Sequence, residues 1–177
     1  MNPAQKLLEK LKAIDRVEEF YETSTKNKFY IIDVDETAIL TDTCADINGC
    51  FSIINPSLKT IYFIPVDGKG IIGKTMPCCE AVIFNDMHFS FLELKLNATS
   101  QTRRAIYRNR IEAVSQLENT IKFFDEKLDS SYEGILLEAI IATPKFYPRL
   151  NSSWIDIADE FLEKNRITLI EVIEKTY

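Results

Sequence analysis

Three charged residues, Glu80, Glu93 and Lys95, lie at the ends of two apolar runs within residues 78–98, CCEAVIFNDMHFSFLELKLNA. Two carboxylates held close together repel each other unless a cation separates them, and their hard oxygens suit Mg²⁺ or Mn²⁺. A lysine beside them can position a water nucleophile or stabilise a charged transition state. If the fold brings the three together, they can carry out metal-assisted phosphodiester hydrolysis. The alternative is a Glu93–Lys95 pair at a sheet margin with Glu80 simply exposed, and the spacing alone favours that alternative.

The second apolar run, residues 89–96, decides which way Glu93 and Lys95 point. Side chains alternate along a strand, so both residues share one face with two phenylalanines, while serine and leucine side chains occupy the other. Both faces are largely apolar, which predicts a central strand that is covered on both sides. Glu93 and Lys95 then lie side by side near its C-terminal end.

A turn signal, Asn-Asp, separates the two runs and predicts a hairpin. The length of the hairpin loop decides whether Glu93 lies opposite Cys79 or Glu80. We favour Glu80, because Cys79 is a small hydrophobic residue that suits a buried position. The hairpin then gathers two carboxylates and a lysine at one end of a sheet.

The rest of the chain predicts an α/β fold with a mixed central β-sheet flanked by helices. The 177 residues fit a single domain, 1–177, which begins with an amphipathic helix over about 3–22. Further elements are predicted as helices over 102–127 and 152–165, and as strands over 28–40, twice within 51–68, and over 134–144 and 166–175.

The order of these features resembles the PD-(D/E)XK nuclease-like superfamily, and especially its small bacterial members, over about residues 58–173. An acidic residue opens a strand, a turn follows, the hydrophobic-E-x-K signature FLELK ends the next strand, and a long helix comes after it. VDG before the hairpin, AVSQLENTI in the long helix, and AIIATPK and ITLIEV in the last strands are also similar. Glu80 stands where the family usually has aspartate, which puts catalytic competence in question.

The resemblance implies a restriction-endonuclease-like core and a set of roles around a bound Mg²⁺ or Mn²⁺. Glu80 and Glu93 would be metal ligands, Lys95 would orient the nucleophilic water, and Gln116 would be an auxiliary contact in the site. Asp67 would be a further acidic ligand, although an ordinary Asp-Gly turn explains it equally well. The expected activity is hydrolysis or binding of nucleic-acid phosphodiesters.

Arginines cluster at the start of the long helix, in SQTRRAIYRNR. The net charge of −6 shows no general basic surplus, so nucleic acid would need such a local patch. Guanidinium groups bind phosphates through paired hydrogen bonds. The predicted contacts are Arg103, Arg104, Arg108 and Arg110, and the alternative is a solvated basic face or ion pairs with acidic residues elsewhere.

A second motif, FYIIDVDETAIL, resembles the first motif of haloacid-dehalogenase-like phosphatases. Asp33 would then be the nucleophile and Asp35 the acid/base. That family needs a later lysine and a downstream acidic pair, and a helix rather than a strand after the motif. We therefore rank the phosphatase below the nuclease-like interpretation.

A third interpretation is a catalytically inactive nuclease-fold subunit that acts as an interaction module in a larger complex, for example in defence against foreign nucleic acid. The helix over 3–22 would then dock a protein partner.

Nothing in the sequence predicts a signal peptide or a membrane-spanning run, so we expect a cytoplasmic protein that does not bind a membrane. The four cysteines lack zinc-site spacing and are predicted to be free, mostly buried thiols: Cys44, Cys50, Cys78 and Cys79.

Overall fold

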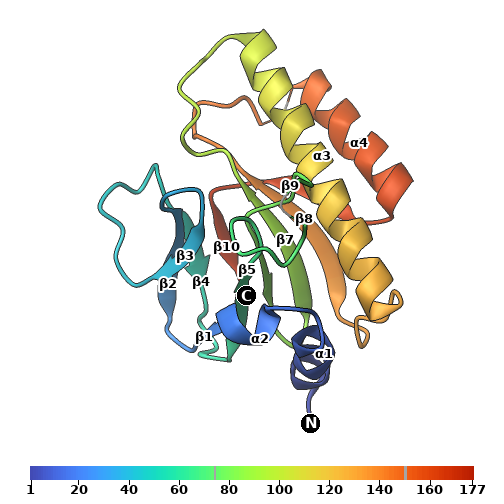
Figure 1. The fold of residues 1–177 in the computed structure, drawn as a ribbon. Coiled ribbons are helices and arrows are strands. Elements are labelled where there is room, and N and C mark those ends of the chain that lie inside the picture. Colours follow the sequence, from blue (N-terminus) through green and yellow to red (C-terminus); the bar gives the residue numbers. More distant parts are fainter. Residues whose placement is uncertain (74, 150) are drawn as a thin grey trace.

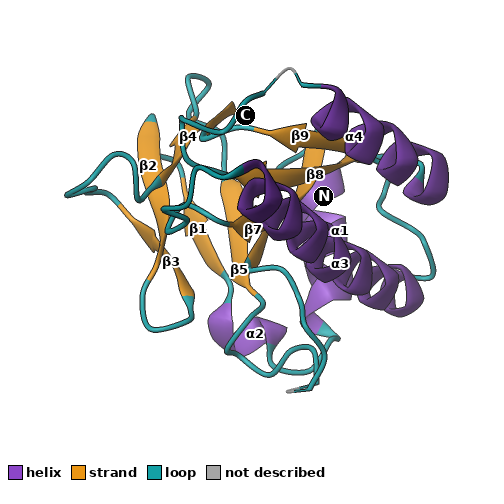
Figure 2. Ribbon diagram, turned by 90° about the horizontal axis from the view of Figure 1, so that it is seen from above, coloured by secondary structure: helices purple, strands orange, loops and turns teal. Residues whose placement is uncertain are grey.

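Two β-sheets lie face to face in the structure, and helices cover the outer face of the larger sheet (Figures 1 and 2). The computed structural model describes residues 1–73, 75–149 and 151–177. The helices are α1 (Pro3–Lys12), α2 (Val17–Phe20), α3 (Arg103–Leu128) and α4 (Ser152–Asn165). The six-stranded sheet has the order β1 (Glu22–Ser24), β5 (Ile61–Pro65), β6 (Ala81–Phe84), β7 (His88–Leu94), β8 (Leu136–Ala142) and β9 (Thr168–Glu171). The four-stranded sheet has the order β10 (Glu174–Thr176), β4 (Phe51–Ile54), β2 (Lys28–Asp33) and β3 (Ala38–Thr41).

The central strand β7 is buried on both faces, as its alternation predicts. Phe89 and Phe91 belong to the apolar layer beneath the helices, whereas Leu92 and Leu94 belong to the layer between the two sheets. The prediction of a mixed sheet flanked by helices is confirmed, because β7 pairs antiparallel with β6 and parallel with β8. The second sheet, which the sequence did not indicate, covers the face that the helices leave free (Figure 2).

The register of the β6–β7 hairpin determines where the charged residues meet. Ala81 pairs with Leu92, so continuing the register by one residue places Glu80 opposite Glu93. The turn is held by Asn85, whose side-chain oxygen accepts hydrogen bonds from the backbone N–H groups of Met87 (2.8 Å) and His88 (2.9 Å). The choice of Glu80 over Cys79 is thus supported by the geometry.

Three of the predicted elements are divided in the structure. The helix predicted over 3–22 becomes α1 and α2, because the chain turns at Arg16, which has a left-handed φ of 68°. The strand predicted over 28–40 folds back on itself as the β2–β3 hairpin. The strand predicted over 166–175 ends at Glu171, and the chain then crosses to the other sheet, where β10 pairs with β4.

Two of the four cysteines form a disulfide, which corrects the prediction of free thiols. Cys44 and Cys50 are bonded in the loop between β3 and β4, with their Cα atoms 6.3 Å apart. Cys78 and Cys79 are free and buried, as predicted. Disulfides persist mainly in oxidising compartments, so this bond does not support the expected cytoplasmic location, which stays a prediction. Among the described residues, no helix has the length and apolar character needed to span a bilayer.

Candidate active site

Glu93, Lys95 and Gln116 come together where β7 ends beside α3. The Lys95 Nζ lies 2.9 Å from Glu93 Oε1 and donates a hydrogen bond of 2.9 Å to Gln116 Oε1. Gln116 in turn donates from Nε2 to the carbonyl oxygen of Cys78, at 3.3 Å. This chain of contacts connects the end of β7, through the helix, to the residues that precede Glu80.

Glu112 is a further member of this group that sequence reasoning missed. Its Oε1 accepts a hydrogen bond of 3.0 Å from Lys95 Nζ, while its side chain stays 59% exposed. Residues four apart lie on the same side of a helix, so the position one turn before Gln116 was the available signal. Within the described part of the chain, Lys95 therefore has three oxygen neighbours, and Glu93 is the fully buried one among them.

Glu93 is the least satisfied of these groups. Its side chain is 1% exposed, and Oε1 is paired with the Lys95 ammonium at 2.9 Å. No hydrogen-bond partner of Oε2 is found among the described residues. One oxygen of Glu80, Oε2, is likewise buried without a partner in the part of the chain that the structure describes. Buried carboxylate oxygens without partners are costly, so these positions have unused capacity for a cation or a proton.

The electrostatics of the two glutamates follow from burial. Burial raises the pKa of Glu93 to about 8, against the attraction of Lys95, which lowers it. Burial also raises the pKa of Glu80 to about 7, and the negative charges of Asp33 and Asp67 add to that increase. Burial alone would lower the pKa of Lys95, but its contacts with Glu93 outweigh that effect and raise it. Perturbed pKa values of this kind are typical of functional sites, although structural ion pairs also produce them.

Asp67 lies close to the two glutamates in a loop that is attached to Glu80. The backbone N–H groups of Val66 and Asp67 both donate to the Glu80 carbonyl oxygen, at 2.8 Å and 3.4 Å. Asp67 Oδ1 accepts from the N–H of Gly68 at 2.8 Å, which is the contact expected of an Asp-Gly turn. The charge of Asp67 also raises the pKa of both Glu80 and Glu93, so it acts on the site electrostatically while supporting its own turn.

The donor set fits a hard divalent cation only in part. Among residues 1–73, 75–149 and 151–177, no three His, Cys, Asp or Glu side chains form a ready-made metal site. The unpartnered oxygens of Glu80 and Glu93 are nevertheless the ligand type that Mg²⁺ and Mn²⁺ take, and Mg²⁺ usually keeps several waters rather than a full protein cage. Glu80 and Glu93 are therefore the residues that would hold such an ion.

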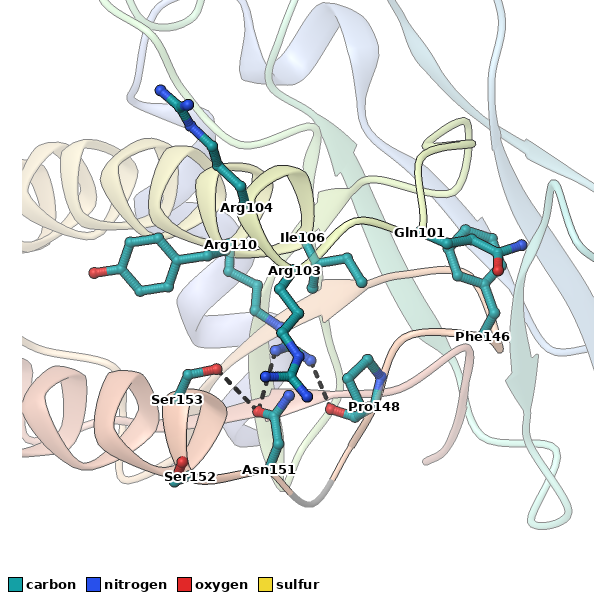
Figure 3. Close-up of a pocket in the computed structure, with 11 residues that line it drawn as sticks. Gln101, Arg103, Arg104, Ile106, Arg110, Phe146, Pro148, Asn151, Ser152 and Ser153 are labelled. Atoms are coloured by element: carbon teal, nitrogen blue, oxygen red, sulfur yellow. Dashed lines mark hydrogen bonds between the residues drawn. The ribbon is translucent and has the colours of Figure 1, made fainter.

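A basic pocket lies at the N-terminal end of α3. It has a volume of about 800 Å³ and is formed by the starts of α3 and α4 together with the loop around Pro148 (Figure 3). Arg103 points toward the wall made by Pro148 and Asn151, whereas Arg104 points away from it (Figure 3). Arg108, like these two, is exposed on the helix.

Arg110 is buried, unlike the other three arginines, and this corrects the prediction that it is available to contact phosphate. Its side chain is 1% exposed, and Nε and Nη2 bind the two oxygens of Glu171 at 3.0 Å and 2.7 Å. Nη2 also donates to the carbonyl oxygen of Pro148 at 2.9 Å. A guanidinium held in this way has no free edge for a phosphate.

The structure also places the two segments on which the alternative functions were based. The apolar side of α1 is buried against its own domain through Ala4, Leu7, Leu8 and Leu11, so that side is not free to dock a partner. The strand that carries the phosphatase-like motif, β2, pairs antiparallel on both sides and continues into β3 rather than into a helix.

The two free thiols do not supply a nucleophile. Burial raises the pKa of Cys78 to about 12 and also raises that of Cys79, so both stay protonated at neutral pH.

A comparison with family models, with curated proteins and with solved structures found no match, so the function has to be inferred from the residues of this chain.

Proposed function

We propose that this protein is a divalent-cation-dependent, nuclease-like phosphodiester hydrolase with its site at the end of β7. The observation that carries the proposal is Glu93, a fully buried carboxylate whose Oε1 pairs with Lys95 and whose Oε2 has no hydrogen-bond partner in the described chain, with Glu80 lying opposite. A purely structural glutamate in a central strand would be expected to have its oxygens paired. The order β5-β6-β7 followed by α3 and β8 also agrees with the resemblance found in the sequence.

The roles of the residues follow from their contacts. Glu80 and Glu93 would hold the cation, which when bound supplies Lewis-acid stabilisation of the phosphate and makes a water more acidic. Gln116 holds the Lys95 ammonium beside Glu93, whereas the exposed Glu112 touches it only from the surface. This placement suits Lys95 to orient a water or to stabilise negative charge on the phosphate. Gln116 therefore positions Lys95 rather than taking part in the reaction.

The exposed arginines give the substrate a place to bind. Arg104, Arg108 and Glu112 follow one another at intervals of four residues, so they form one ridge of α3 that leads toward Lys95. Arg103 is turned instead toward the pocket at the start of α4 (Figure 3). We propose that Arg103, Arg104 and Arg108 contact the phosphate backbone and that Arg110 does not.

The proposal predicts that Glu93→Ala and Lys95→Ala each lower Mg²⁺- or Mn²⁺-dependent cleavage of DNA or RNA by at least about 100-fold, because each removes a group that acts on the transition state. Single- and double-stranded substrates are assayed side by side. Glu112→Ala is the matched control, since it touches the same lysine from the surface and should retain most activity. Cleavage that persists in Glu93→Ala contradicts the proposal. Nucleic-acid binding without any cleavage in the parent protein favours the inactive, interaction-module alternative.

The raised pKa values predict that cation binding strengthens as the pH rises. Because the pKa of Glu80 is about 7 and that of Glu93 about 8, both carboxyl groups are largely protonated at pH 6 and must release protons to bind a cation. We expect the dissociation constant for Mn²⁺ to fall by at least about tenfold between pH 6 and pH 8.5. Calorimetry in buffers with different ionisation enthalpies counts the released protons, and an affinity that does not change with pH would show that the carboxylates are already ionised.

A further inference from the structure

The basic pocket at the N-terminal end of α3 has two chemically different ends. Figure 3 shows Ser152 and Ser153 at one end and Gln101 and Phe146 at the other, with Arg103 between them. Phe146 is 42% exposed, so its ring offers an accessible apolar surface. The volume of about 800 Å³ lies within the range of sites that hold small organic molecules, about 300–1,000 Å³. The pocket therefore has room for a ligand with one charged and one aromatic part.

The polar end of the pocket favours an anion. No ion pair of the Arg103 side chain is found in the part of the chain that the structure describes. None of the described lining residues is acidic, although the whole chain has 27 acidic and 21 basic residues. Ser152 and Ser153 begin α4, so their backbone N–H groups have no acceptor within the helix. Because a guanidinium binds phosphate oxygens through paired hydrogen bonds, phosphate is the anion that suits this end best.

One wall of the pocket is held in place by the buried guanidinium of Arg110. Its Nη2 donates to the Pro148 carbonyl oxygen at 2.9 Å, and its Nη1 donates to Asn151 Oδ1 at 3.5 Å. The same oxygen of Asn151 accepts from the Ser153 hydroxyl at 3.1 Å and from the backbone N–H of Trp154 at 2.9 Å. These bonds connect the loop before α4 to α3, so the wall is ordered before a ligand binds. A preformed site loses less conformational entropy on binding.

We propose that this pocket binds one unpaired nucleotide of a single-stranded nucleic acid, with its phosphate at Arg103 and its base against the ring of Phe146. Base–aromatic stacking accepts any base, and the Gln101 amide offers both a donor and an acceptor to the base edge. A base within a duplex is stacked and paired, so it cannot enter such a pocket unless it leaves the helix. This inference rests on the proposed function and names its substrate as single-stranded.

The distance along α3 is compatible with one strand that reaches both the pocket and the candidate active site. Arg103 and Glu112, which contacts Lys95, are about 14 Å apart along the helix axis. The ridge that includes Arg104 and Arg108 lies between them and can follow the phosphates of such a strand. The bond that is cleaved would then lie a few nucleotides from the one held in the pocket.

Calorimetric titration with adenosine 5′-monophosphate in EDTA tests the pocket without a cation at Glu80 and Glu93. We expect Arg103→Ala and Phe146→Ala each to weaken binding by at least about fivefold, because one removes the phosphate contact and the other the stacking surface. Lys122→Ala is the matched control, because it removes one exposed positive charge from the same helix about 28 Å away and should bind as the parent does. All three positions are exposed, so no variant should prevent folding. Adenosine and inorganic phosphate, titrated separately, should each bind more weakly than the monophosphate.

Three results of this titration would overturn the inference. The first is a parent protein that does not bind the monophosphate. The second is equal weakening in Arg103→Ala and Lys122→Ala, which would mean that only net charge attracts the ligand. The third is inorganic phosphate that binds as tightly as the monophosphate while Phe146→Ala has no effect, which would leave an anion site without a place for the base.

Cleavage kinetics separate this inference from the proposed function. With Mg²⁺, Phe146→Ala should raise KM for a single-stranded substrate by at least about fivefold and leave kcat unchanged, because the ring binds the substrate away from the reacting phosphate. An unchanged KM in a protein that cleaves would overturn the role of the pocket and leave the proposed function intact. A parent protein that binds the monophosphate but cleaves no nucleic acid would overturn the proposed function, and with it the assignment of the nucleotide to a substrate strand.

Discussion

Replacement of Arg110 by alanine is expected to lower the free energy of unfolding by about 3–5 kcal/mol, the cost typical of breaking a buried ion pair on one side. Arg110 and Glu171 are each 1% exposed and form two hydrogen bonds with each other. Without Arg110, the ion-pair partner left to Glu171 among the described residues is Arg149, whose Nη1 lies 3.4 Å away and whose side chain is 30% exposed. Urea denaturation followed by circular dichroism measures the change.

Two comparisons decide whether the ion pair causes that loss. Arg108→Ala, on the exposed side of the same helix, should change stability by less than about 0.5 kcal/mol. Arg110→Met combined with Glu171→Leu should recover much of the loss, because no charge is left buried alone. A loss below about 1 kcal/mol in Arg110→Ala would show that Arg149 or water compensates, and would reopen the prediction that Arg110 contacts phosphate.

The sequence predicted well where local signals and side-chain alternation agree. The Asn-Asp turn and the alternation along residues 89–96 were sufficient to place Glu80 opposite Glu93 and Lys95 on the same face. The long helix was predicted for a similar reason, since apolar residues recur along one of its sides. The same pattern places Arg110 beside Ile106 and Ala113 on the buried side, which was the available signal that Arg110 is a core residue.

The remaining features depend on contacts between distant parts of the chain. The turn at Asp35 and Glu36 contains no glycine or asparagine, so residues 28–40 gave no sign of folding back on themselves. The packing of this turn on Gly68, whose added Cβ atom would lie 2.7 Å from Thr37 Oγ1, joins parts of the chain that are far apart in sequence, so no local pattern encodes it. The second sheet was missed as well, because no local pattern shows that β2, β3 and β4 pair apart from the larger sheet and are joined by β10 from the far end of the chain.

Replacement of Glu93 by glutamine is expected to stabilise the folded protein at alkaline pH while it abolishes cation binding. The pKa of Glu93 is raised to about 8 in the folded state, from 4.5, so the unfolded chain loses this proton first as the pH rises. The folded state of the parent therefore loses stability between about pH 4.5 and pH 8. Glutamine cannot ionise, so the advantage of the variant should be less than about 1 kcal/mol at pH 5 and about 4–5 kcal/mol at pH 8.5.

With saturating Mn²⁺ the parent should become more stable than Glu93→Gln, the opposite of their order without metal. This reversal distinguishes a carboxylate that binds a cation from one that only supports the fold. Saturating Mn²⁺ stabilises the parent by binding only its folded state, whereas Glu93→Gln should show no such increase in melting temperature. Glu112→Gln, which also contacts Lys95 but from the surface, should follow the parent both with and without Mn²⁺. A Glu93→Gln variant that is less stable than the parent at every pH would identify Glu93 as the structural partner of Lys95. A Glu93 that lowers stability at neutral pH and restores it when Mn²⁺ binds would instead support the proposed cation site.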